Sequence, residues 1–219
     1  MKLDIEEALR YLGAGPDAPE ELRQQVETMA SRLTAALSPS YVFRMCGLEK
    51  RENGIYLTDT EVCLTGRMAA KMLAQCDRAV LLACTLGAEF DAMLRMEQVR
   101  DMGRAVILDA CGGAWVEAGC DAAEEELRTR LPGVYLTDRF SPGYGDLPLE
   151  TQPAICAALD AARRVGIHVS DSLLMNPVKS VTAVIGISDQ PQMARIRGCG
   201  YCSMRERCQL RKGGKHCGI

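Results

Sequence analysis

Apolar residues recur every three or four positions in several stretches of the chain, which is the period of an amphipathic helix. From Leu22 to Leu37 they form one continuous face. Asp4 is a suitable N-cap for a shorter first helix, and Gly13 ends it. The longest helical pattern contains four glycines, which predict close packing against another helix or, alternatively, against a bulky ligand. The predicted helices cover residues 3–12, 19–37, 67–75, 88–96, 98–130 and 151–164.

Other stretches have the pattern of strands. Residues 78–84 form a continuous apolar run, which is typical of a central strand buried on both faces. Glu52-Asn53-Gly54 separates two β-like stretches and predicts a hairpin. Strands mixed with helices, with at least one hairpin, predict an α+β fold in which helices flank a mostly antiparallel twisted sheet. One predicted strand begins at residues 41–43, and the others cover residues 55–57, 78–84, 134–136, 167–169 and 180–187.

Composition narrows the class of protein. The chain has 219 residues, of which 47% are hydrophobic, so it can bury one substantial core and carry a small appendage. A net charge of −3 and an aromatic content of 5% argue against a nucleic-acid-binding protein. The acidic N-terminus lacks the order of a signal peptide, and no apolar stretch reaches 18 residues, so we expect a cytoplasmic protein without a membrane span.

The eleven cysteines fall into two groups. In a chain without an export signal, packing or metal binding is favoured over disulfides. Seven cysteines in apolar surroundings are interpreted as small buried hydrophobic residues: Cys46, Cys63, Cys76, Cys84, Cys111, Cys120 and Cys156. The other four crowd into the last 21 residues, where the composition changes to Arg, Gly and Cys. We therefore divide the chain into a main domain, residues 1–190, and a Cys-rich metal-binding tail, residues 191–219.

The tail cysteines have the spacing Cys199-x2-Cys202-x5-Cys208-x8-Cys217. Four thiolates at short spacing suit tetrahedral zinc or an iron–sulfur cluster. The spacing matches neither a plain zinc ribbon nor the bacterial ferredoxin run, so both metals stay open. The alternative is a tail with unpaired thiols, which would be prone to oxidation.

Residues 139–146, Arg-Phe-Ser-Pro-Gly-Tyr-Gly-Asp, are dense in unusual residues. Proline and the two glycines fix an irregular backbone, while one cation, one hydroxyl, one aromatic ring and one carboxylate stand beside them. Such a loop can lie against a flat, polar small molecule. The alternative is an ordinary Pro-Gly turn with an incidental arginine.

Two motifs in order carry a resemblance to a known family. Arg-x-Ser-Pro-Gly-Tyr at residues 139–144 is followed by Ser-x-x-Met-x-Pro-x-x-Ser-Val-Thr at residues 172–182. Together they resemble the activation domain of cobalamin-dependent methionine synthase, whose motifs read Arg-x-Ala-Pro-Gly-Tyr and Ser-x-x-Met-x-Pro-x-x-Ser-Val. The match covers residues 130–188. Residues 145–148, Gly-Asp-Leu-Pro, stand where the family has a cysteine and a histidine, and the second aromatic that follows the Ser-Val strand is missing.

The resemblance implies a site for S-adenosylmethionine. Arg139 would hold the carboxylate of the ligand, because a guanidinium binds a carboxylate bidentately. Ser141 and Gly143 would offer backbone groups, and Tyr144 would lie near the sulfonium or the corrin face. The residues implied in cofactor binding are Arg139, Ser141, Pro142, Gly143, Tyr144, Ser172, Met175 and Ser180.

The resemblance also implies a function, namely reductive remethylation of cob(II)alamin on a partner methionine synthase or related methyltransferase, with S-adenosylmethionine as methyl donor. The cobalamin-binding sequence Asp-x-His-x-x-Gly is absent, so the corrinoid has to arrive on the partner. An electron donor such as flavodoxin or ferredoxin is implied, and the need for a low-potential electron slightly favours [4Fe–4S] over zinc in the tail. Two alternatives stay open: an iron–sulfur electron-transfer or corrinoid-handling protein that does not use S-adenosylmethionine, and a zinc-stabilised binding module.

Overall fold

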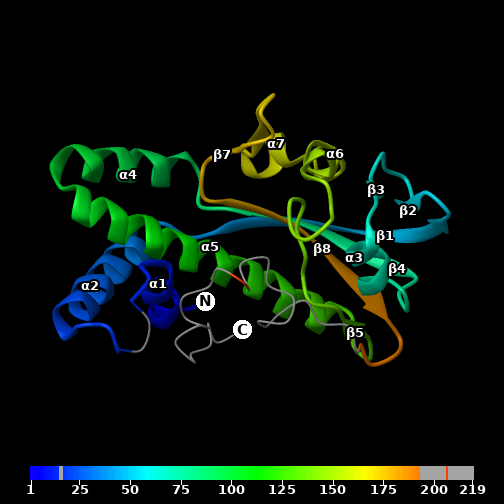
Figure 1. The fold of residues 1–219 in the computed structure, drawn as a ribbon, viewed down its shortest axis with the longest axis horizontal. Coiled ribbons are helices and arrows are strands. Elements are labelled where there is room, and N and C mark those ends of the chain that lie inside the picture. Colours follow the sequence, from blue (N-terminus) through cyan, green and yellow to red (C-terminus); the bar gives the residue numbers. More distant parts are fainter. Residues whose placement is uncertain (15–16, 193–205, 207–219) are drawn as a thin grey trace. The chain divides into compact units, whose positions relative to one another are not determined.

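A six-stranded sheet organises the chain in a computed structural model that describes residues 1–14, 17–192 and 206 (Figure 1). Its strand order is β3-β2-β1-β4-β8-β5, and β6 and β7 form a separate two-stranded sheet. The strands are β1 (Ser40–Arg51), β2 (Gly54–Leu57), β3 (Cys63–Leu64), β4 (Arg78–Thr85), β5 (Tyr135–Leu136), β6 (His168–Val169), β7 (Met175–Asn176) and β8 (Ser180–Ser188). The neighbouring strands β1 and β2, β2 and β3, and β5 and β8 pair antiparallel.

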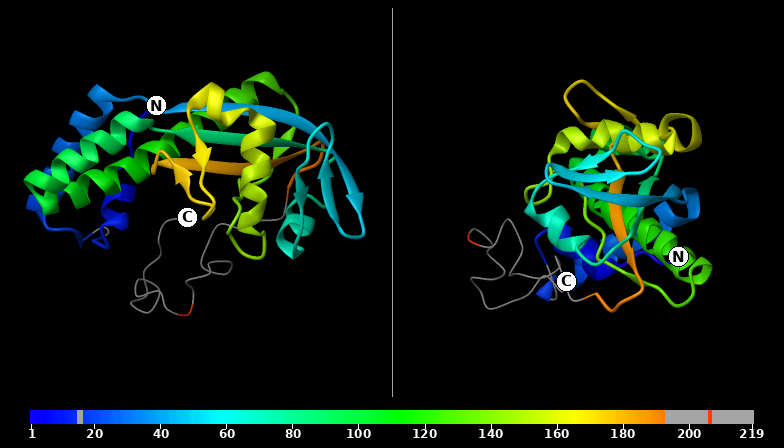
Figure 2. Two further views of the ribbon diagram at one scale, coloured as in Figure 1. Left: turned by 90° about the horizontal axis from the view of Figure 1, so that it is seen from above. Right: turned by 90° about the vertical axis from the view of Figure 1, so that its right-hand side faces the viewer.

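Seven helices of the described residues accompany the sheet (Figures 1 and 2). They are α1 (Ile5–Tyr11), α2 (Glu20–Ala36), α3 (Arg67–Met72), α4 (Ala88–Arg100), α5 (Met102–Arg130), α6 (Gln152–Leu159) and α7 (Ala161–Val165), with the 3-10 turn η2 at Leu149–Thr151. The predicted α+β class with a mostly antiparallel sheet is confirmed. The Cys-rich appendage lies outside the described residues, so it and the domain boundary at residue 190 stay predictions.

The chain forms two compact units. Unit 1 contains Met1–Val42, Ala83–Glu126 and Ala161–Val181. Unit 2 contains Phe43–Leu82, Leu127–Asp160 and the described residues from Thr182 onward. Unit 1 therefore holds α1, α2, α4, α5, α7 and the β6–β7 hairpin, whereas unit 2 holds most of the large sheet with α3 and α6.

In unit 1, the predicted starts of the first two helices are close to the observed ones. The Asp4 carboxylate caps α1 by accepting hydrogen bonds from the amides of Glu6 (2.9 Å) and Glu7 (3.2 Å). Helix α2 begins at Glu20 and buries Val26 and Leu33 completely. Figure 1 shows α1 beside α2, and their residues are in contact.

The glycines of α5 are places of close packing, as predicted, and neighbouring side chains occupy the space. A Cβ at Gly112 would lie 2.3 Å from Cζ of Phe90, whose ring is fully buried. Gly119 packs in the same way against Pro39 and the Sγ of Cys84. The packing interpretation therefore holds for these two glycines, because side chains of the protein itself fill the gaps.

In unit 2, two strand predictions are confirmed. Strand β4 lies between β1 and β8, and every residue from Ala79 to Thr85 is buried. In the β1–β2 hairpin Arg51 pairs with Gly54, which leaves Glu52 and Asn53 as the turn. The continuous apolar run thus marked an interior strand.

The boundaries of several predicted helices differ from the observed ones. Helix α4 extends to Arg100, and α5 begins only after Asp101, whose carboxylate accepts the amide of Arg104 (3.2 Å). The helix predicted over residues 151–164 is divided at Asp160, which has a left-handed backbone (φ 52°). Aspartate adopts this conformation more readily than most residues, so no glycine marked the break.

Six of the seven scattered cysteines are buried, as predicted, and Cys63 is half-buried. Burial raises the pKa of the Cys111 thiol to about 12 and that of Cys156 to about 11. These thiols therefore stay protonated and behave as small apolar side chains. Cys199, Cys202, Cys208 and Cys217 lie outside the described residues.

The described part of the chain contains no group of three or more His, Cys, Asp or Glu side chains arranged to hold a metal ion. Within the same residues no helix is long and apolar enough to cross a membrane.

Candidate functional site

The loop at residues 139–146 belongs to unit 2 and is anchored on the sheet by its second residue. Phe140 is buried and forms a bridge with Val184, exchanging two backbone hydrogen bonds of 3.0 and 2.8 Å. Just before it, the amide of Thr137 donates to the carbonyl of Gly186 (3.0 Å). The loop therefore begins at a fixed point beside strand β8.

Three backbone hydrogen bonds fold the loop on itself. The amide of Tyr144 donates to the Ser141 carbonyl (3.1 Å), and the amide of Gly143 donates to the Leu147 carbonyl (2.9 Å). The amide of Leu147 in turn donates to the Tyr144 carbonyl (3.2 Å). Gly143 and Gly145 have φ values of 83° and 62°, which favour glycine. The backbone that the sequence predicted as irregular is thus an ordered, tightly bonded turn.

The predicted binding residues of this loop differ in their exposure. Arg139, Ser141 and Tyr144 are half-buried, Pro142 is buried, and Gly143 is exposed. A half-buried guanidinium and a half-buried phenol ring on one short loop are a donor set that suits a ligand with a carboxylate and a cationic sulfur. The residue types present therefore fit S-adenosylmethionine.

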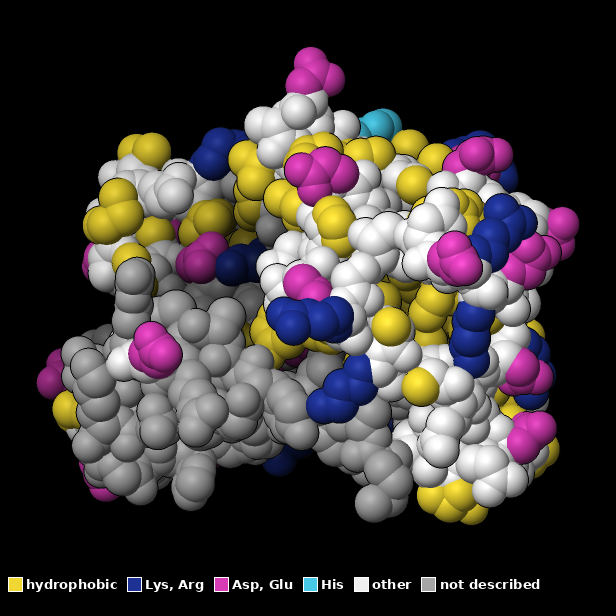
Figure 3. Space-filling model, turned by 45° about the vertical axis from the view of Figure 1, so that its right-hand side comes forward, with side chains coloured by type: hydrophobic (Ala, Val, Ile, Leu, Met, Phe, Trp, Pro, Cys, Tyr) yellow, Lys and Arg dark blue, Asp and Glu magenta, His cyan; other side chains and the backbone are white. Residues whose placement is uncertain are grey.

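On the face that Figure 3 shows, acidic, basic and hydrophobic side chains of the described residues are interspersed. The case for a site in unit 2 therefore rests on the loop and its residues.

Asp146, the carboxylate that ends the loop, has a role within the fold. Its two oxygens accept hydrogen bonds from the amides of Met68 (2.9 Å) and Arg67 (2.8 Å), which are the first two residues of α3. Those hydrogen bonds, first from Met68 and then from Arg67, hold the pKa of Asp146 below its usual range. The N-cap residue Gly66 has no side chain to perform this task, so Asp146 caps α3 from a distant part of the sequence.

The Asp146 cap gives a prediction. Replacement by alanine is expected to speed hydrogen exchange at the amides of Arg67 and Met68 and to lower the melting temperature by a few degrees. Asp146→Asn, which keeps one acceptor oxygen, should have exchange rates and a melting temperature between those of wild type and Asp146→Ala. The control is Glu61→Ala, which removes an exposed carboxylate of the same unit.

The Asp146 cap should also depend on pH. Because the pKa of Asp146 is lower in the folded protein, the cap stabilises above the usual aspartate pKa and is lost as the pH falls through the folded value. The difference between wild type and Asp146→Ala should therefore shrink in acid. If the amides of Arg67 and Met68 exchange at the same rates in wild type and in Asp146→Ala at neutral pH, Asp146 does not cap α3.

The second motif, residues 172–182, begins in unit 1 at the turn of the β6–β7 hairpin. Val169 pairs with Met175, and the Ser170 hydroxyl lies 2.9 Å from that of Ser172 and accepts the amide of Leu174 (3.1 Å). Ser172 is exposed and Met175 is half-buried. The hairpin therefore places both predicted residues at or beside a defined turn.

The middle of the second motif is held by two carboxylates on helices. Both oxygens of buried Asp91, in the first turn of α4, lie 3.3 Å from the amide of Val178. The Nζ of Lys179 donates to Asp109 of α5 (2.9 Å). Neither partner was paired by the sequence analysis, since each lies at least 70 positions away. The only sequence signal was the presence of a lysine inside a motif that otherwise lacks charge.

Ser180, the last predicted binding residue, has its hydroxyl engaged within unit 1. It donates to the Pro177 carbonyl (2.7 Å) and lies 2.8 Å from the hydroxyl of Thr85 at the end of β4. The amide of Leu86 donates to the Lys179 carbonyl (3.0 Å) beside it. The hydroxyl thus orders the motif.

The two motifs fall in different compact units, with residues 139–146 in unit 2 and residues 172–181 in unit 1. Each is well ordered by contacts inside its own unit. Their joint action on one ligand, and the binding roles of the individual residues, stay predictions.

Comparisons with known proteins support the fold. At the level of sequence, no family model matches the chain and no curated protein matches it. At the level of structure, the chain is similar to the MetH reactivation domain bound to AdoHcy, with a TM-score of 0.64 and 18% sequence identity. That likeness covers 95% of this chain and 77% of the other. The protein therefore has the fold of a methionine synthase reactivation domain, as its two motifs predicted.

Proposed function

We propose that this protein binds S-adenosylmethionine and serves in the reductive reactivation of a corrinoid held by a partner methionine synthase or related methyltransferase. The single observation that carries the proposal is the coincidence of two motifs, in order, with a fold similar to that of a reactivation domain bound to AdoHcy. AdoHcy is what S-adenosylmethionine becomes when its methyl group is transferred. The motifs and the likeness in fold thus both support this ligand.

Under this proposal the chain supplies position rather than chemistry. Arg139 binds the ligand carboxylate, and the exposed backbone of Gly143 lies against the ligand. Tyr144 faces the sulfonium, which its ring attracts. The hydrogen bonds of the 139–146 turn keep these groups in place before the ligand arrives. The methyl group of the ligand would pass from its sulfonium to the reduced corrinoid held by the partner protein, which would leave AdoHcy.

The electron required for reduction comes from a donor such as flavodoxin or ferredoxin. The tail cysteines Cys199, Cys202, Cys208 and Cys217 would hold [4Fe–4S] or zinc, and a cluster would suit relay of that electron. A cluster in the tail would also fit a second candidate, an iron–sulfur electron-transfer or corrinoid-handling protein that does not use S-adenosylmethionine. Purification without oxygen separates the two metals, because a [4Fe–4S] protein is brown and a zinc protein is colourless.

The test uses a methionine synthase that lacks its own activation domain and is arrested as cob(II)alamin. We expect the intact protein, a low-potential reductant and S-adenosylmethionine together to restore the visible spectrum of methylcobalamin. Omission of S-adenosylmethionine or of the protein should leave the cob(II)alamin spectrum unchanged. No return of methylcobalamin with the partner and all components present would contradict the proposed function.

A further inference from the structure

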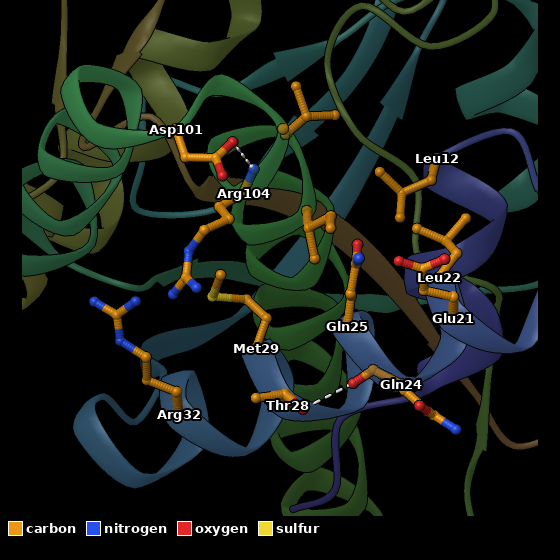
Figure 4. Close-up of a pocket in the computed structure, with 13 residues that line it drawn as sticks. Leu12, Glu21, Leu22, Gln24, Gln25, Thr28, Met29, Arg32, Asp101 and Arg104 are labelled. Carbon is orange, nitrogen blue, oxygen red and sulfur yellow. Dashed lines mark hydrogen bonds between the residues drawn. The ribbon is translucent and has the colours of Figure 1, made fainter.

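A groove in unit 1 is lined by residues that belong to neither motif. Helix α2, the end of α1 and the first turns of α5 enclose a volume of about 830 Å³ (Figure 4). That is within the range of ligand pockets, about 300–1,000 Å³. Its apolar lining consists of Leu12, Leu22, Met29, Val106 and Ile107.

Two arginines at the groove share one buried carboxylate. Nη1 of Arg32 donates to one oxygen of Glu97, and Nε of Arg104 donates to the other at 3.2 Å. The Glu97 side chain is only 2% exposed, whereas those of Arg32 and Arg104 are 38% and 54% exposed. The two guanidinium groups, with the Arg32 hydrogen bond as the larger cause, hold the pKa of Glu97 below its usual range. The ionised carboxylate of Glu97 therefore holds both guanidinium groups in place.

The cluster retains positive charge and unused donors. Two guanidinium groups face one carboxylate, and each has five N–H groups, of which one donates to Glu97. Within residues 1–14 and 17–192, the structure gives neither arginine another acceptor. Figure 4 shows the two guanidinium groups turned toward the same side of the groove, next to Met29.

Two acidic residues also line the groove. Asp101 accepts the amide of Arg104 and caps α5, so its carboxylate already has a partner. Glu21 lies on the side of the groove opposite Arg32 (Figure 4). The arrangement therefore has a cationic end, an apolar floor and an acidic far end.

We propose that this groove binds a small organic carboxylate, whose carboxyl group bridges the outward edges of Arg32 and Arg104 and whose apolar part covers Met29 and Ile107. Arginine forks suit a carboxylate geometrically, and both are held in place by Glu97 before binding. Removal of apolar surface from water adds to the affinity. None of the residues that line this groove belongs to the proposed S-adenosylmethionine site.

The test titrates the intact protein with octanoate by calorimetry, with octanol as the uncharged ligand of equal chain length. We expect octanoate to bind measurably more tightly than octanol. Arg104→Gln should weaken octanoate binding about tenfold, because a charge-assisted hydrogen bond is lost at a partly exposed site. Arg104→Lys, which keeps the charge without the fork, should lie between wild type and Arg104→Gln.

The Glu97→Gln substitution is expected to change the octanoate affinity in the opposite direction. The amide of the new side chain keeps one oxygen that can accept from an arginine, but it lacks the negative charge that competes with the ligand. Octanoate binding is therefore expected to tighten several-fold, even though the variant loses stability through its ion pairs. A cluster that only stabilises unit 1 would not produce affinity changes of opposite sign in the two variants. Equal binding of octanoate and octanol, no binding of octanoate at millimolar concentration, or unchanged affinity in Arg104→Gln would each overturn the proposal.

Discussion

Arg139→Ala is expected to weaken S-adenosylmethionine binding by about a hundredfold, the effect of losing a bidentate, charge-assisted contact with the ligand carboxylate. The Arg139 side chain is half-buried on an ordered loop. In the variant, water therefore does not fully replace the lost contact with the ligand carboxylate. Arg139→Lys keeps the charge but not the fork and should recover only part of the affinity. Isothermal calorimetry measures both variants against wild type.

A matched control separates ligand binding from general charge. Arg164→Ala removes one exposed arginine of α7 and should leave the affinity unchanged. All variants should keep the far-ultraviolet circular dichroism of wild type. Wild-type affinity in a folded Arg139→Ala protein would remove Arg139 from the site.

Phe90→Ala is expected to reduce the free energy of unfolding by about 3–5 kcal/mol, because the ring is fully buried and its removal leaves a cavity. The ring lies against Gly112 of α5, where a Cβ would approach to 2.3 Å. Gly112→Ala should therefore also destabilise, by about 1–3 kcal/mol, through overpacking. Urea denaturation followed by circular dichroism measures both changes.

The contact between Phe90 and Gly112 can be tested by compensation. Phe90→Leu combined with Gly112→Ala should cost less than the sum of the two single changes, because the smaller side chain makes room for the new methyl group. Gly103→Ala, in the exposed first turn of the same helix, should cost less than Gly112→Ala, because a Cβ there meets only the Asp101 carboxylate oxygen, at 3.2 Å. Strictly additive costs in the double variant would show that the two positions do not share this space.

Local sequence patterns predicted the elements that depend on local chemistry. The Asp4 cap, the face of α2 and the interior strand β4 each follow from residues that lie next to one another in the sequence. The start of β1 was predicted at residues 41–43, but its extent to Arg51 was not, because the strand alternates only weakly between buried and exposed positions. The break between α4 and α5 was predicted near residue 97 and lies at Asp101, and the break at Asp160 was missed, because aspartate is permitted, but not required, at such positions.

The parts of the site that escaped prediction depend on distant partners. The composition of residues 139–146 drew attention to the loop, yet Asp146 was grouped with the ligand-binding chemistry. Its partners on α3 lie 79 and 78 positions away, and no local pattern reveals such a cap. The same holds for Lys179 with Asp109, and for the Arg32–Glu97 pair that shapes the groove of unit 1.

Titration of the intact wild-type protein with S-adenosylmethionine by calorimetry tests the central claim most directly. We predict saturable binding with one ligand per chain, competition by AdoHcy, and loss of this binding in Arg139→Ala. The absence of any binding at millimolar ligand, in a preparation shown to be folded by its circular dichroism and cooperative melting, would contradict the proposed function.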